Sequence, residues 1–119
     1  MSKTLRASDL AQFTGSQTWR RHPLNPNITY TDGAHHVARA GEAYWLLDAI
    51  VAHQLDPKVA AHEFQVWKLV VAANRSAVLI CEDGDHHLVA KQEIGFTDFP
   101  LAEIILWFQN QVIFLPSEY

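Results

Sequence analysis

The chain has 119 residues, a length typical of one domain, and apolar residues make up 49% of it. Its formal net charge of −4 excludes the broad basic surface with which nucleic-acid-binding proteins hold phosphate groups. The single cysteine, Cys81, excludes an internal disulfide, and no apolar run approaches the roughly 18 residues that span a membrane. We therefore expect one cytoplasmic domain over residues 1–119, without a nucleic-acid or membrane partner.

The first half of the chain predicts helices and one irregular segment. Residues 8–13 form a short predicted helix, and the prolines and asparagines within residues 16–30 predict irregular chain anchored by large apolar side chains. A second helix begins at the capping residues 31–33 and ends near Gly41. Residues 42–54 are apolar nearly all round, which predicts a central buried helix.

The second half of the chain predicts a sheet. Apolar and polar residues alternate in residues 64–73, 77–82 and 88–96, and short polar turns separate these segments, as in an antiparallel meander. The apolar residues of 99–108 recur at helical spacing and predict a last helix, and 112–115 supplies a candidate fourth strand. The predicted fold class is α+β, with N-terminal helices packed on a three- to four-stranded antiparallel sheet and a late C-terminal helix.

One face of the predicted sheet carries a large aliphatic area among a few charged side chains. A contiguous apolar patch of this kind usually marks an interaction site. Trp107 lies off the apolar stripe of the predicted last helix, and tryptophan is enriched at the energetic centres of interfaces. Either the irregular segment covers this face or a protein partner does, and we favour a partner, including a second copy of the chain. The predicted binding residues are Val66, Val70, Val78, Ile80, Val89 and Trp107.

Asp48 lies inside the apolar helix predicted for residues 42–54, where an unpaired carboxylate is costly. In a structural role, it accepts hydrogen bonds from backbone N–H groups or from Arg20 or Arg21 of the irregular segment. In a catalytic role, it is the general base of a small hydrolase. No nucleophile or oxyanion motif accompanies it, so we favour the structural role and predict no catalytic residue.

The metal-ligand patterns that the sequence offers are weak. Adjacent histidines point in different directions on a helix or a strand, and no His-Glu-x-x-His motif is present. The acidic turn 82–85 lacks the alternating oxygen ligands of a calcium loop, so we expect a solvated hairpin there. Cys81 lies in a strand on the inner face, and we expect it to be a small core residue. We therefore predict no metal and no cofactor. The histidines are His22, His35, His36, His53, His62, His86 and His87.

Seven segments, in order along nearly the whole chain, resemble a family of small uncharacterised bacterial proteins. The family is a domain of unknown function, common in cyanobacteria and proteobacteria and often encoded on plasmids and mobile elements. The resemblance implies a bacterial or phage source and one domain, and it carries over no activity or catalytic residue. The segments are LAQFTG (10–15), YTDG (30–33), AYWLLDAI (43–50), FQVWKL (64–69), CEDG (81–84), FTDFPL (96–101) and LPSEY (115–119).

The function that we expect from these observations is a non-enzymatic protein-binding or modulator domain. Given the resemblance, an accessory role on a mobile element follows, including inhibition of a host defence protein. The alternative is a small hydrolase or metal-dependent enzyme that uses Asp48 and the histidines. A pocket lined by Asp48 and at least two histidines would favour the enzyme, whereas an exposed apolar sheet face would favour the binding domain.

Overall fold

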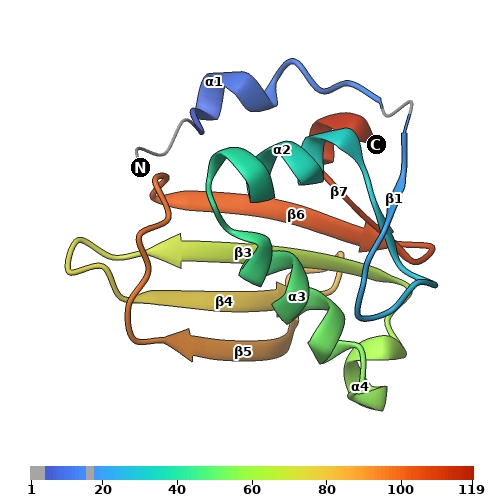
Figure 1. The fold of residues 1–119 in the computed structure, drawn as a ribbon. Coiled ribbons are helices and arrows are strands. Elements are labelled where there is room, and N and C mark those ends of the chain that lie inside the picture. The colour runs from blue at the N-terminus through green and yellow to red at the C-terminus, as the bar shows by residue number, and fades with distance from the viewer. Residues whose placement is uncertain (1–4, 16–17) are drawn as a thin grey trace.

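The computed structural model describes residues 5–15 and 18–119, and in that part of the chain a seven-stranded mixed sheet carries helices on one face (Figure 1). The strands follow the order β1-β2-β7-β6-β3-β4-β5 across the sheet. Their bounds are β1 Arg20–Arg21, β2 Thr29–Tyr30, β3 Phe64–Val71, β4 Ala77–Glu82, β5 Leu88–Ile94, β6 Glu103–Gln109 and β7 Val112–Phe114. The helices are α1 Ala7–Leu10, α2 Asp32–Ala40, α3 Tyr44–His53 and α4 Pro57–Ala60, and the 3-10 helix η1 is Pro116–Glu118.

The predicted antiparallel meander is present as β3, β4 and β5. β3 pairs with β4 so that Trp67 lies opposite Cys81 and Leu69 lies opposite Leu79. These four side chains are at most 1% exposed, because all of them point to the face that the helices cover. Successive side chains of a strand point to opposite faces, so the residues between them point to the other side of the sheet.

The prediction of a late helix over residues 99–108 is wrong, because most of this segment forms strand β6, which pairs antiparallel with β3. Ile104, Leu106 and Phe108 are at most 4% exposed, so burial follows the period of two that a strand has. A short apolar run fits the period of a helix as well as that of a strand, and the β-branched and aromatic residues of segment 99–108 favour a strand. A two-residue turn at 110–111, with φ angles of 55° and 63°, then folds β7 back onto β6.

The sheet is also wider and more mixed than the predicted three- to four-stranded antiparallel sheet. Residues 16–30, predicted as irregular, contribute β1 and β2, which pair antiparallel with each other. β2 then runs parallel to β7, with Thr29 opposite Val112 and Tyr30 opposite Ile113. Strands of two residues are too short to show a periodicity in the sequence. The fold class is therefore corrected to a seven-stranded mixed sheet with short helices.

Helices α2 and α3, both predicted, lie over the same face of the sheet (Figure 1). Gly41 ends α2, as expected, and a Cβ at this position would lie only 2.7 Å from the carbonyl oxygen of Val37. Helix α3 begins three residues later and turns its most apolar side toward the sheet. Its buried residues are Leu46, Leu47, Ile50 and Val51.

The C-terminal turn η1 closes the N-terminus of α2. Thr31 caps this helix by accepting the N–H of Ala34 (3.3 Å), and its hydroxyl donates to Glu118 Oε1 (2.6 Å). Glu118 Oε2 accepts the N–H of Gly33 (3.0 Å), so a carboxylate lies at the positive end of the helix. A Cβ at Gly33 would collide with this carboxylate, so the arrangement requires glycine there.

The side-chain amide of Gln65 joins the sheet to the end of the helical layer. Gln65 is fully buried on the inner face of β3, and its Nε2 donates to the carbonyl oxygens of Val59 (2.9 Å) and His62 (3.0 Å). Its Oε1 accepts from Trp67 Nε1 (2.9 Å) and from Gln54 Nε2 (2.7 Å). A buried polar group is tolerated when its partners are in place, and here one amide satisfies groups on α3, α4 and β3.

We expect Gln65→Leu to lower the free energy of unfolding by about 3 kcal/mol, because it leaves several buried donors and acceptors without partners. Gln92→Leu is the matched control, since Gln92 is exposed and makes one side-chain hydrogen bond, to His53 (2.8 Å). Its loss should stay below about 1 kcal/mol. Urea denaturation of both variants measures the difference, and equal losses would contradict the role given to Gln65.

Candidate functional site

The face of the sheet opposite α2 and α3, here called the outer face, presents the side chains that alternate with the buried ones. Its central part lies on β4, β3 and β6, where the strand register arranges the side chains in three ranks. Across the strands the ranks are Glu82–Val66–Trp107, Ile80–Lys68–Ile105 and Val78–Val70–Glu103.

The outer face is mainly apolar and only partly exposed. Val70 is 41% exposed, and its apolar neighbours are half-buried because they shield one another. Lys68 and Glu82 form an ion pair across two strands (Nζ to Oε1, 3.0 Å), so the charges near the centre are already matched. The predicted positions of Val66, Val70, Val78 and Ile80 on one face therefore agree with the register.

Trp107 belongs to this face for a different reason from the one predicted. It lies on strand β6 beside Val66, whereas the sequence placed it on a helix. Its ring contacts three other aromatic rings, with centroid distances of 5.2 Å to Phe64 on β3, 6.1 Å to Phe114 on β7 and 5.5 Å to Tyr119. Tyr119 is 78% exposed, so this aromatic cluster reaches solvent.

Val89 is an exception among the predicted binding residues. The register between β4 and β5 shifts at Cys81 and Glu82, where Ala90 and Leu88 are their partners. Val89 is therefore the extra residue of a bulge and packs against the core, while Leu88 is 63% exposed. Alternation of polar and apolar residues does not reveal a bulge, which explains the wrong placement of Val89 on the outer face.

A hollow of about 530 Å³ lies at one corner of the outer face. Val70, at the end of β3, and Val78, at the start of β4, form part of its apolar wall, and Glu93 lies at its rim. The aromatic cluster lies at the opposite corner, because Phe64 begins β3 and Trp107 lies near the end of β6. The outer face therefore carries a hollow at one corner and, at the diagonally opposite corner, an aromatic cluster whose Tyr119 is exposed.

Asp48 has a structural partner, but not the predicted one. Its side chain is 51% exposed, and Oδ1 lies 2.8 Å from Nε2 of His22, which is 2% exposed. The N–H of Leu24 donates to His22 Nδ1 (3.1 Å), so the ring proton is on Nε2 and is donated to Asp48. Both nitrogens of His22 are thus occupied, and the pair fastens the segment before β2 to α3.

A second polar group near Asp48 involves Tyr30, His35 and Tyr44. His35 Nε2 lies 3.1 Å from the hydroxyl of Tyr44. Burial, followed by the charges of Arg20 and then Arg39, lowers the pKa of His35, and burial, followed by Tyr44, raises the pKa of Tyr30. At neutral pH His35 is therefore neutral and Tyr30 keeps its proton, and no serine or cysteine nucleophile lies among these contacts.

The turn between β4 and β5 brings His87 next to two carboxylates of the acidic turn 82–85. Ligand atoms of Asp83, Asp85 and His87 lie within 4.8 Å of one another, because His86, at φ 67°, reverses the chain. The N–H of His87 (3.0 Å), the N–H of Asp85 (2.8 Å) and the His87 ring (3.0 Å) contact the Asp83 carboxylate and hold its pKa below the usual value. These groups bond to one another on an exposed hairpin, and the expected absence of a metal stays a prediction.

Comparison with protein families identifies the chain as one whose relatives have no assigned activity. A family model matches residues 4–119. The chain belongs to DUF6876, a family of unknown function. No curated protein and no solved structure matches it. The DUF6876 match confirms the resemblance to an uncharacterised family, while a bacterial or mobile-element origin stays a prediction.

The DUF6876 match spans β1 to β7 and therefore includes the outer face, the Asp48–His22 pair and the acidic turn together. Within residues 5–15 and 18–119, no helix is long and apolar enough to cross a membrane.

Cys81, the one cysteine of this DUF6876 chain, is fully buried, and burial raises its pKa to about 12. The thiol is therefore protonated at neutral pH, as a core residue and not a nucleophile.

We expect Cys81 to resist thiol-specific reagents at pH 7 to 8 as long as the protein is folded, because its thiol is both buried and protonated. Labelling followed by mass spectrometry measures this, with Ala52→Cys as the control, since Ala52 is exposed on α3, away from the outer face. The control thiol should react within minutes and Cys81 only on addition of denaturant. Equal labelling of the two thiols without denaturant would contradict the buried position of Cys81.

We expect Asp48→Ala to lower the free energy of unfolding by about 1 kcal/mol, because water can reach the exposed site and replace the lost acceptor. His22→Ala should cost about 2–3 kcal/mol, since it empties a buried space. Asp48→Asn keeps an acceptor for His22 and should be the mildest of the three. Thermal melts give the order, and a larger loss for Asp48→Ala than for His22→Ala would contradict it.

Proposed function

We infer that the protein is a non-enzymatic protein-binding module, and that a second copy of the chain is the partner that its outer face meets. The observation that supports this is the apolar surface that runs across β4, β3 and β6 on the side without α2 and α3. Contiguous apolar surface on a folded domain is most often covered by another molecule. The other candidate to cover it was the segment of residues 16–30, whose described part, residues 18–30, is instead tied to β7 and α3.

The size of the outer face is compatible with an interface. The five neighbouring strands β7, β6, β3, β4 and β5, about 4.8 Å apart and about 20 Å long, give a projected area of roughly 500 Å². An interface of standard size takes about 800 Å² of accessible surface from each partner. Side chains expose more surface than their projection, so nearly the whole outer face would take part, as in the face-to-face packing of two sheets.

The charges of the outer face suit a copy of itself better than a strongly charged partner. Lys68 and Glu82 are already paired at 3.0 Å, so covering them leaves neither charge without its partner. Lys91, Glu93 and Glu103 lie toward the edges, where water or an opposite charge of the partner can reach them. A surface with both signs and an apolar centre has the anatomy of a homodimer interface.

Two-fold symmetry also fits the diagonal arrangement of the corners. In a symmetric dimer the same patch is used by both copies, so a protruding group of one copy meets a depression of the other, twice. A two-fold axis between the corners would place the aromatic cluster around Trp107 and Tyr119 against the hollow at Val70 and Val78. Exposed aromatic residues are the usual anchors of such contacts.

The hydrolase or metal-enzyme alternative has less support. Asp48 is bonded to a histidine whose two nitrogens are both engaged, and Asp48 lines neither the hollow of the outer face nor its rim. The three groups at the acidic turn are solvent-facing and already satisfy one another. Inhibition of a host defence protein, which the family resemblance suggests, stays a prediction.

We expect the chain to sediment as a dimer at tens of micromolar, and Val78→Lys to raise the dimer dissociation constant at least tenfold, because a charged group then takes part of the apolar wall of the hollow that the partner's aromatic cluster would fill. Leu55→Lys is the matched control, since Leu55 is 85% exposed and follows α3 on the helical side. It should leave the mass unchanged. A monomer at high micromolar concentration, or equal effects of the two variants, would contradict the dimer.

A further inference from the structure

Half of strand β6 has a free edge. β3 pairs with β6 from Glu103 to Gln109, but β7 pairs on the other side only with Trp107, Phe108 and Gln109. Beyond Phe114 the chain leaves the sheet and turns into η1, which begins at Pro116. Among residues 5–15 and 18–119, no strand therefore pairs with residues 103–106 on the side away from β3.

The backbone groups at this edge are directed outward in a known order. The N–H of Val71 donates to the carbonyl oxygen of Ala102 (2.8 Å), so Ala102 faces β3. Residues of an antiparallel strand face alternate neighbours, which makes Ile104 and Leu106 face β3 as well. Glu103 and Ile105 then direct their N–H and C=O groups away from β3, and no described residue forms a backbone hydrogen bond with them on that side.

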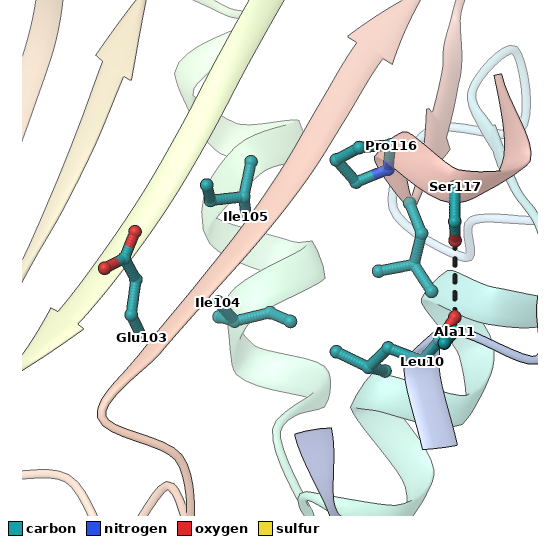
Figure 2. A pocket seen from close by; sticks show the side chains of 8 residues that line it. Leu10, Ala11, Glu103, Ile104, Ile105, Pro116 and Ser117 are labelled. Carbon is teal, nitrogen blue, oxygen red and sulfur yellow. Dashed lines mark hydrogen bonds between the residues drawn. The ribbon is translucent and has the colours of Figure 1, made fainter. Parts of the chain in front are cut away.

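A hollow of about 350 Å³ lies directly beside the free edge. Figure 2 shows it between β6 on one side and α1 and η1 on the other, with Ile104, Leu10 and Pro116 around it. The hydroxyl of Ser117 donates to the carbonyl oxygen of Leu10 (3.3 Å), so the two far walls are joined to each other. The lining is almost wholly apolar, and its size lies at the small end of ligand-binding pockets.

We propose that this edge binds an extended peptide segment of another protein by strand addition. The peptide backbone pairs with Ile105 and Glu103, and one aliphatic side chain of the peptide enters the hollow between Leu10 and Ile104. Main-chain hydrogen bonds supply affinity in this mode of recognition, and the pocket for an alternate side chain supplies specificity. A basic side chain next to the aliphatic one in the peptide points to the other face of the sheet, where it lies near the exposed carboxylate of Glu103.

The length of the free edge favours a single peptide over a second folded sheet. It spans residues 103–106, and the β6–β7 hairpin and η1 close it at one end. The protein's other free edge, strand β5, is longer, with seven residues and a bulge. At the β6 edge, η1 and α1 would obstruct a strand that belongs to another sheet. A peptide of four to six residues needs only the slot between β6 and η1.

The test begins with a random octapeptide library displayed on phage and selected on the full-length chain. The best peptides are synthesised with blocked ends and measured by fluorescence anisotropy. We expect an aliphatic residue and a lysine or arginine at adjacent positions, and protection of the Ile105 amide in hydrogen exchange on binding. A peptide that protects no amide at residues 103 or 105 would overturn the proposal.

Variants separate the edge from the outer face. Ile105→Pro removes the N–H on the open side and leaves the bonds to β3, so it should weaken binding at least about tenfold, whereas Ile105→Val should not. Glu103→Lys should weaken a basic peptide several-fold, and Glu63→Lys, an exposed control, should not. Circular dichroism verifies folding, and the two glutamate variants decide the matter if Ile105→Pro unfolds.

Peptide binding must also persist in the Val78→Lys variant, because the edge does not depend on the dimer. Binding that disappears with Val78→Lys but survives Glu103→Lys would assign the peptide to the outer face and overturn strand addition. Selection that yields no peptide with a dissociation constant below about 1 mM would overturn it as well. Neither result bears on the sedimentation test, so the two proposals fail separately.

Discussion

The buried amide of Gln65 ties the helical layer to the inner face of the sheet. It lies on the inner face at the start of β3 and holds the end of α3, the α4 segment and the indole of Trp67 at once. An amide can satisfy this many groups only in one arrangement, because its donors and acceptor have fixed directions. The end of the helical layer is thereby held to the inner face, and the apolar residues that alternate with Trp67 lie on the other face.

A sheet covered on one face leaves two kinds of surface with different chemistry. Its outer face offers apolar side chains, whose attraction for a partner has no direction and grows with the area covered. Its open edge at Ile105 offers N–H and C=O groups, which accept a partner only in one register. The first suits a broad surface such as another copy of the sheet, and the second suits a single extended chain. The two surfaces meet along β6, where Glu103 and Ile105 belong to both.

Long, regular patterns were predictable from the sequence. The alternation in residues 64–73, 77–82 and 88–96 gave the meander, and the apolar run at 42–54 gave α3, because each extends over more than one period. The segment 99–108 misled because pairs such as Ile104 and Ile105 fit a helix and a strand equally well. The pairing with β3, which no local pattern encodes, decides between them.

Site details depended on contacts between distant residues. The segment that supplies the partner of Asp48 was predicted correctly, but the partner is His22 and not an arginine, and the helix leaves Asp48 half exposed. Gln65 gave no signal, since one glutamine in a strand is usually solvent-facing. The apolar excess on the outer face was visible from the alternation of residues alone. The bulge that takes Val89 off this face, and the strand β6 that places Trp107 on it, were not.

The parallel pairing of β2 with β7 has a consequence for how the protein is made. The cap of α2 uses Glu118, and β2 lies against Val112 and Ile113, so an early segment of the chain depends on a late one. During synthesis the ribosome delivers residues one after another, and the N-terminal segment waits without its partner until residues 112–118 have emerged. The meander of β3, β4 and β5 has its hairpin contacts available earlier, so it can form first and serve as a template. Residues 29–34, translated before the meander, are then among the last of the described residues to reach their final positions.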